Sequence, residues 1–71
     1  MNLLNKYIEI NKDLVGGQPV FRGTRVTVKT LFDYLEESSI EEFLEGHPTV
    51  SREQAESVLE AAAENFLATL S

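Results

Sequence analysis

The 71-residue sequence predicts a mainly α, three-helix domain of the helix-turn-helix class (homeodomain-like or winged), with a short N-terminal β-hairpin. Two observations predict this fold. Apolar and polar residues alternate before residue 28, whereas beyond it the apolar residues recur at the spacings of three and four that are typical of helices. Two capping patterns that begin with Ser then divide the second part into separate helices. We expect a single domain over residues 1–71, with β segments in 1–28 and the trihelical region in 28–71.

The N-terminal third contains the predicted β segments. Residues 7–10 (YIEI) alternate as a short strand does, and residues 11–13 form a polar turn. Residues 16–28 (GGQPVFRGTRVTV) predict a tight, basic β-hairpin that leads directly into a helix. We expect four residues to be structural there because their backbones are unusually free or unusually restricted: Gly16, Gly17, Pro19 and Gly23.

The side chains of this hairpin are expected to divide between two faces, because successive strand residues point in opposite directions. The apolar set should face the core: Phe21, Val26 and Val28. The polar set should face solvent or a partner: Arg22, Arg25 and Thr27.

The first helix is expected to begin at Val28, with Thr27 as its N-cap, and to end near Glu37. Its inward face is defined by apolar residues at helical spacing: Val28, Leu31, Phe32 and Leu35.

The second helix follows a capping-box pattern from Ser39 to Glu42, in which the hydroxyl and the carboxylate each satisfy an amide at the helix start. Its inward face holds Ile40, Phe43 and Leu44. Two residues are expected to end it, Gly46 as a left-handed cap and Pro48 as a residue that cannot continue a helix.

The third helix begins with a second capping box, from Ser51 to Gln54, with Val50 placed as a hydrophobic staple. Its predicted apolar stripe is Ala55, Val58, Leu59, Ala62 and Phe66, opposite Glu53, Glu56, Glu60 and Glu64. Beyond residue 62 the apolar residues cover more of the circumference than one core contact needs. We interpret three of them as an oligomer or partner surface, with a frayed C-terminus as the alternative: Phe66, Leu67 and Leu70.

The small size of the chain predicts self-association. A core of this size supplies only about 3–5 kcal/mol, and natural chains this short usually add disulfides, a metal or a partner. The sequence contains no Cys, so we expect a homo-oligomer, a dimer or a larger assembly. We also expect a cytoplasmic protein without membrane association, because no apolar run approaches the roughly 20 residues of a membrane span and the first six residues lack the apolar segment of a signal peptide.

The net charge of −6 is unevenly distributed. Residues 1–30 hold five basic and two acidic residues, whereas residues 31–71 hold ten acidic residues and only Arg52 as a base. The division suggests two surfaces with different partners. The alternative, which we favour for the acidic half, is a solvated face that keeps the protein soluble.

Two stretches of the chain resemble a known family. The run GGQPVFRGTRVTV, followed by residues 38–62 (SSIEEFLEGHPTVSREQAESVLEAA), is similar to domain of unknown function 433 (DUF433), with its GG-x-PV-x-RGTR-x-x-V signature. The resemblance covers roughly residues 8–63. Gln18 replaces a common Lys, and Glu37-Ser38-Ser39 replaces a turn that commonly carries Gly.

The resemblance implies a helix-turn-helix-like domain and a function. Such domains are often interpreted as the antitoxin of a toxin–antitoxin pair whose toxin is a PIN-like ribonuclease with a metal-binding carboxylate cluster. Arg22 and Arg25 match the RGTR positions, and an arginine inserted into that cluster would compete with the cation. The alternative is that these arginines brace the hairpin by binding carbonyl groups or the acidic second helix.

The residues give little support for catalysis. His47 lies between Gly46 and Pro48 where a helix ends, and neither a Cys nor a recognisable Ser nucleophile is present. Acidic residues of the second helix would fan outward rather than converge on a cation. We therefore predict no enzyme activity, cofactor, metal or small-molecule substrate.

Nucleic-acid binding is the other candidate function. The chain would bind operator DNA together with a toxin, or act alone as a transcription regulator. A further alternative is a protein-interaction module that binds no nucleic acid. A helix-turn-helix would present Arg52 and Gln54 at the start of its third helix. The neighbouring glutamates and a pI near 4.5 argue against binding through that helix alone. Phosphate contacts are better expected from the hairpin and the first helix: Arg22, Arg25 and Lys29.

Overall fold

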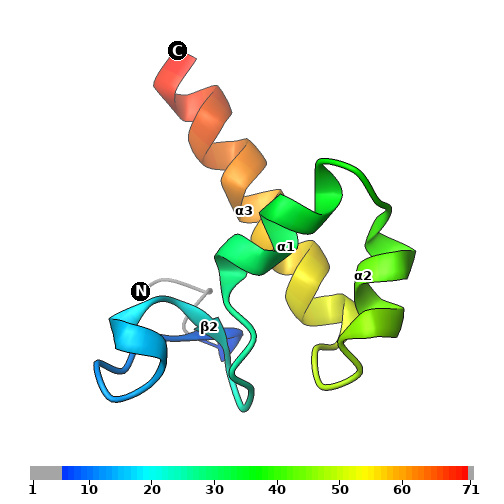
Figure 1. The fold of residues 1–71 in the computed structure, drawn as a ribbon. Helices are drawn as coiled ribbons and strands as arrows, with labels where there is room; N and C mark the ends of the chain where they lie inside the picture. Colours follow the sequence, from blue (N-terminus) through cyan, green and yellow to red (C-terminus); the bar gives the residue numbers. More distant parts are fainter. Residues whose placement is uncertain (1–5, 71) are drawn as a thin grey trace.

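The computed structural model describes residues 6–70 of the chain, without the side chain of Leu70. The chain is mainly helical, with three helices and a short two-stranded antiparallel hairpin at its N-terminal end (Figure 1). In chain order the elements are β1 (Ile8–Glu9), the 3₁₀ turn η2 (Val15–Gly17), β2 (Val20–Phe21), α1 (Val28–Leu35), α2 (Ile40–Gly46) and α3 (Arg52–Leu70).

The strand pairing differs in part from the prediction. β2 pairs with β1, in the register Ile8 with Phe21 and Glu9 with Val20, so the hairpin spans residues 8–21. The hairpin expected within residues 16–28 is reduced to an isolated bridge between Val20 and Thr27. Both residues of β2 are fully buried. Phe21, Val26 and Val28 pack in or against the core and Arg22 and Arg25 are exposed, as predicted, whereas Thr27 is half-buried.

Hydroxyl caps define the starts of the first two helices, as expected. The Thr27 hydroxyl accepts a hydrogen bond from the Thr30 amide at 3.1 Å, and the Ser39 hydroxyl accepts one from the Glu42 amide at 3.1 Å. The Glu42 carboxylate accepts a 3.3 Å hydrogen bond from that same hydroxyl. The local side chains therefore fix where α1 and α2 begin.

The end of α2 corrects the predicted role of Gly46. The helix includes Gly46, which does not have a positive φ, and the C-cap is His47 with φ −134° and ψ 69°. The helix ends at Gly46 because the next residue, His47, precedes proline and is disfavoured in the helical region. Pro48 thus ends the helix without a left-handed glycine.

The core is formed by residues from the hairpin and all three helices: Phe21, Leu31, Phe43, Val50, Ala55 and Val58. Phe43 lies at its centre, with ring centroids 6.2 Å from Phe21 and 5.7 Å from Tyr34. Phe32, predicted to face inward, is 39% exposed. Tyr34 meets α2 instead, because it lies three residues after the buried Leu31 and so shares its face of the helix, whereas Phe32 is turned about 100° away.

The third helix is longer than the elements that cover it. α3 has 19 residues, whereas α1 has eight and α2 has seven. At 1.5 Å per residue, α3 is therefore longer than either of the other helices. Ala55 and Val58 are buried, whereas residues 62–69 are all exposed. Ala62 and Phe66, the last two residues of the predicted apolar stripe, are therefore exposed, as expected for Phe66 if it belongs to a partner surface. Figure 1 shows this part of α3 projecting beyond α1.

Candidate interaction surfaces

A tight turn holds the RGTR residues. The Phe21 carbonyl accepts hydrogen bonds from the Thr24 amide at 2.9 Å and from the Thr24 hydroxyl at 2.8 Å. The same hydroxyl accepts one from the Val26 amide at 3.0 Å. Gly23 occupies the third turn position with φ 83°, which side chains rarely allow. The turn therefore places the two arginines on opposite sides of a glycine and a threonine that have structural roles.

Arg22 braces the hairpin. One guanidinium nitrogen, Nη2, donates a 2.9 Å hydrogen bond to the Ile8 carbonyl on the neighbouring strand. Its own carbonyl accepts a 3.1 Å hydrogen bond from Nε2 of Gln54 on α3. Arg22 thus connects β1, β2 and α3, which is the bracing alternative raised by the sequence.

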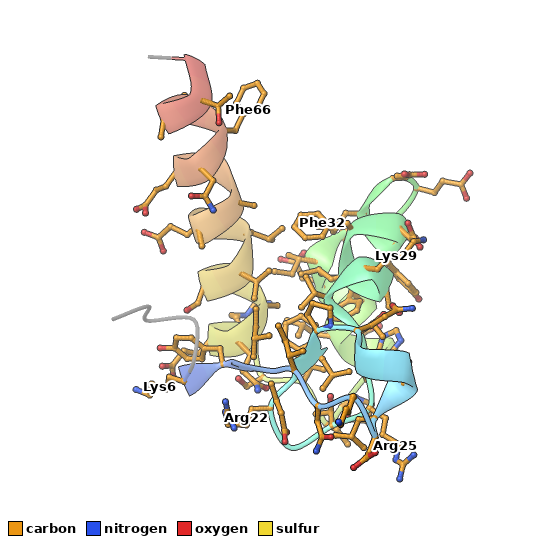
Figure 2. The ribbon with its side chains drawn as sticks, turned by 90° about the vertical axis from the view of Figure 1, so that its left-hand side faces the viewer. Lys6, Arg22, Arg25, Lys29, Phe32 and Phe66 are labelled. Carbon is orange, nitrogen blue, oxygen red and sulfur yellow. The ribbon has the colours of Figure 1, made fainter. Side chains whose placement is uncertain are left out.

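Arg25 has a different environment. Its side chain is exposed, and among the described residues it makes no hydrogen bond or ion pair. Figure 2 shows it at the edge of the hairpin region, well separated from Arg22. Its guanidinium can reach a partner without breaking a contact within the described part of the chain.

An open depression adjoins Arg25. It has a volume of about 560 Å³ and is lined by Glu9, Leu14, Gly23, Thr24, Arg25, Val26 and Thr49. The loop beside it carries exposed apolar side chains, Ile10 at 70% and Val15 at 40% exposure. Val15 has φ 46°, which is rare for a β-branched residue. Sequence reasoning missed this surface because residues 11–13 read as an ordinary polar turn.

Gln54 uses both ends of its amide within the chain. Its Oε1 accepts a 3.0 Å hydrogen bond from the Ser51 amide, while the Ser51 hydroxyl accepts one from the Gln54 amide at 3.0 Å. Its Nε2 donates to the carbonyls of Arg22 and, at 3.4 Å, Tyr7. The reciprocal capping box is present as predicted, and the side chain expected to contact DNA also joins α3 to the hairpin.

The other predicted cations on the helices are paired. Arg52 lies 3.2 Å from a Glu56 carboxylate oxygen and 3.8 Å from one of Glu41. Lys29 lies 2.7 Å from the Asp33 carboxylate, and this hydrogen bond and charge raise the pKa of Lys29 above its usual 10.5. Contact with phosphate would require each to leave or share its carboxylate.

The projecting part of α3 carries the predicted oligomer surface. Phe66 is 64% exposed and Leu67 62% exposed (Figure 2). Leu70 is the last residue of the helix, and its side chain falls outside the described part of the chain. We call residues 62–69 the α3 end.

His47 has a packing role. Its ring stacks on Phe43 with centroids 4.5 Å apart, and its Nδ1 lies 2.8 Å from the Phe43 carbonyl oxygen.

The sequence did not predict two contacts of Tyr7. Its hydroxyl donates a 2.7 Å hydrogen bond to Glu53, and the Lys6 ammonium lies 5.5 Å from the centre of its ring. The first of these joins residues 46 positions apart in the chain, so no local pattern indicates it.

The predicted structural residues have these backbone positions. Gly16 and Gly17, both within η2, have φ of 65° and 84°. The Pro19 carbonyl accepts a 3.0 Å hydrogen bond from the Val28 amide at the start of α1.

Within residues 6–70, no three His, Asp or Glu side chains gather as metal ligands would, and no helix there is long and apolar enough to cross a membrane.

The RGTR turn, the hairpin, α1, α2 and the first half of α3 lie in the stretch that matches a known family. A family model described as "Protein of unknown function (DUF433)" matches residues 8–61. The chain belongs to the DUF433 family. Comparison with curated proteins and with solved structures gives no match. The DUF433 match ends just before the α3 end, which therefore lies outside the part that defines the family.

Proposed function

We propose that this DUF433 protein is a non-enzymatic antitoxin of the cytoplasm, built on a helix-turn-helix-like trihelical domain, that binds and neutralises a PIN-like ribonuclease toxin. The observation that carries the proposal is the α3 end, where Phe66 and Leu67 are mostly exposed on a helix that leaves its own domain. Exposed aromatic and aliphatic side chains on a projecting helix are suited to a partner's apolar groove.

Arg25 is the arginine we assign to the toxin's carboxylate cluster. A guanidinium offers two parallel hydrogen bonds to carboxylate oxygens, and its charge competes with the metal that they hold. Arg22 already donates to the Ile8 carbonyl, whereas Arg25 is exposed and makes no such bond among the described residues. The α3 end would supply the affinity, and Arg25 the occlusion of the active site.

Contact with operator DNA is proposed for the toxin complex rather than for this chain alone. Arg52 is paired with two glutamates and Gln54 binds backbone groups of its own chain. The acidic start of α3 would also repel phosphates. In a complex with several copies of this chain, the exposed Lys29 of each copy would contact phosphate by leaving or sharing the Asp33 carboxylate.

Co-expression with the product of the adjacent gene tests the proposal. Pull-down, light scattering and a ribonuclease assay would be applied to the wild type, Arg25→Ala and Phe66→Ala, with Lys29→Ala as the matched control for loss of a surface cation. We expect a stable complex without ribonuclease activity. Arg25→Ala should restore the ribonuclease activity of the toxin while the complex persists. Phe66→Ala should raise the dissociation constant of the complex roughly tenfold or more.

Two outcomes would contradict the proposal. The first is the absence of any complex together with a homodimer that shifts its own upstream DNA, which would assign the chain as a stand-alone regulator. The second is a complex whose toxin stays fully active, which would make the chain an interaction module without a neutralising role.

A further inference from the structure

An uncharged stripe runs along one face of α3. Its members are spaced alternately four and three residues apart: Ala55, Leu59, Ala62, Phe66 and Thr69. This spacing keeps them on one face, because two turns of an α-helix contain about seven residues. Ala55 is buried and Leu59 packs against the core, whereas Ala62 and Phe66 are exposed. The face that the domain covers in the first half of α3 therefore continues, uncovered, into the α3 end.

Phe32 extends this exposed surface onto α1. Its ring is 39% exposed, and Figure 2 shows it on the side of α1 that faces α3. Phe66 projects from α3 on that same side, farther toward the C-terminus (Figure 2). Two small exposed residues, Ala62 and Ala63, precede Phe66 by about one turn of the helix. We call these four residues the aromatic face: Phe32, Ala62, Ala63 and Phe66.

The aromatic face is complementary in shape to a second copy of itself. If two α3 ends run antiparallel about a two-fold axis level with residue 64, each Phe66 lies opposite Ala62 of the other copy. A large side chain opposite a small one is the arrangement by which facing helices interdigitate. The tip of each α3 then points toward the other copy's α1, where Phe32 is exposed.

The position of α1 selects the antiparallel arrangement. Leu31 of α1 shares the core with Ala55 and Val58 of α3, so α1 covers the first half of the stripe. In a parallel pair, both α1 helices would occupy the same level between the two α3 helices and would collide. In an antiparallel pair, each α1 lies beyond the tip of the other copy's α3, which projects past its own α1 (Figure 1).

Charge does not oppose this pairing. Glu60 and Glu64 lie about 120° and 160° around the helix from Phe66, at 3.6 residues per turn. They therefore occupy the outer surfaces of the pair, about 20 Å from the glutamates of the other copy, since a helix with its side chains is about 10 Å wide. That separation exceeds the screening length of about 8 Å at physiological salt.

The exposed area indicates a weak contact. With about 150–250 Å² per ring and exposures of 64% and 39%, Phe66 and Phe32 of two copies offer roughly 300–500 Å² of apolar surface. Interfaces that bury less than about 1,200 Å² in total are mostly transient. A two-fold pair makes every contact twice, so this small face is sufficient for a dimer that dissociates on dilution.

We propose that the free chain forms a weak antiparallel dimer through the aromatic face. Each Phe66 packs against Ala62 of the other copy, and each α3 tip covers the other copy's Phe32. The contact is isologous and closes after two copies. The proposal concerns the chain alone and goes beyond the interaction with a toxin; a toxin that binds the α3 end competes with the second copy for Phe66.

Sedimentation velocity of the purified chain over a concentration series tests the proposal. Phe66→Ala should raise the dimer dissociation constant roughly tenfold or more, and Phe32→Ala roughly threefold or more, because each removes a ring from the contact. The matched control is Ile10→Ala, which removes a side chain of 70% exposure outside the aromatic face. It should leave the dissociation constant unchanged.

Filling the small position gives a prediction of opposite sign to general hydrophobic association. Ala62→Phe adds exposed apolar surface, which by itself would strengthen self-association. The proposal predicts instead a dissociation constant raised roughly tenfold or more, because two rings then compete for one space. An equimolar mixture of Ala62→Phe and Phe66→Ala should restore dimerisation, because every contact in the mixed dimer again joins a ring to an alanine.

Any of four results overturns the proposal. These are a wild type that stays monomeric at millimolar concentration, an Ala62→Phe protein that dimerises as tightly as the wild type or more tightly, a mixture that dimerises no better than its components, and an Ile10→Ala protein weakened as much as Phe66→Ala. Circular dichroism checks that the variants are folded, as expected for exposed positions. Because no toxin is present, these results are independent of whether the chain neutralises one.

Discussion

The two halves of α3 have similar sequences and different environments. Ala55 and Val58 in the first half are 0% and 4% exposed, whereas Phe66 and Leu67 in the second half are 64% and 62% exposed. Both halves carry apolar residues at helical spacing, opposite several glutamates in the first half and opposite Glu64 in the second. The difference teaches that periodicity predicts which face of a helix is apolar, but not whether the same chain covers it.

Replacement of one phenylalanine in each region should separate them most clearly. Phe43→Ala removes the ring at the centre of the core and should lower the free energy of unfolding by about 3–5 kcal/mol, comparable to the whole stability of a domain this size. Phe66→Ala should change it by less than about 0.5 kcal/mol. Urea denaturation of dilute protein measures both, and equal losses would contradict the comparison.

Loss of the Gln54 side chain tests how the first half of α3 is tied to the hairpin. Gln54→Ala should lower the free energy of unfolding by about 1–2 kcal/mol, because it removes the cap on Ser51 and the hydrogen bond to the Arg22 carbonyl. Ser51→Ala removes only the hydroxyl cap and is the matched control. A Gln54→Ala loss no greater than that of Ser51→Ala would show that the link to the hairpin adds nothing.

The two arginines of the RGTR turn should behave as a structural and a surface residue. Arg22→Ala should lower the free energy of unfolding by about 1 kcal/mol through loss of its bond to the Ile8 carbonyl. Arg25→Ala should leave it within about 0.5 kcal/mol. Chemical denaturation of the two single variants gives the comparison, and Arg22→Lys controls for charge, since lysine keeps the charge without the guanidinium geometry. Greater destabilisation by Arg25→Ala would reverse the assignment.

The smallest effect is expected from the exposed Lys29–Asp33 pair. The pKa of Lys29 is raised above 10.5 in the folded chain, first by its hydrogen bond to Asp33 and then by the charge of that carboxylate. The stabilisation is therefore fully present below about pH 10.5 and is lost as the pH rises through the folded pKa. Urea titrations at rising alkaline pH should show the stability gap between the wild type and Asp33→Asn closing; a constant gap would exclude the linkage.

Local signals in the sequence predicted much of the fold. Thr27, Ser39 and Ser51 cap the three helices at the predicted positions, because a cap depends on residues within one turn. The pairing of β2 with β1 was not predicted, since it joins residues that are far apart in the chain and the nearer hairpin has the stronger turn signal. Phe32 was misplaced for a similar reason, because the position of α2 decides which ring of α1 is covered.

The candidate surfaces could be predicted only in part. Arg25 and the exposure of Phe66 follow from patterns visible in the sequence. The different roles of Arg22 and Arg25 could not be predicted from the sequence, because they depend on which carbonyl groups lie within reach of each guanidinium in the folded chain. The depression beside Arg25 was missed because Leu14 and Thr49 come near Arg25 only after the chain has folded.

Hydrogen exchange along α3 in dilute solution tests the central contrast most directly. Buried helix amides open only with the domain, whereas amides on an uncovered helix end exchange through local fraying. We predict slow exchange over residues 55–61 and exchange at least about a hundredfold faster over 62–69, with protection of the second segment appearing as the protein concentration rises. Uniformly slow exchange across both segments in dilute, monomeric protein would contradict the account, because the α3 end would then be covered by its own chain.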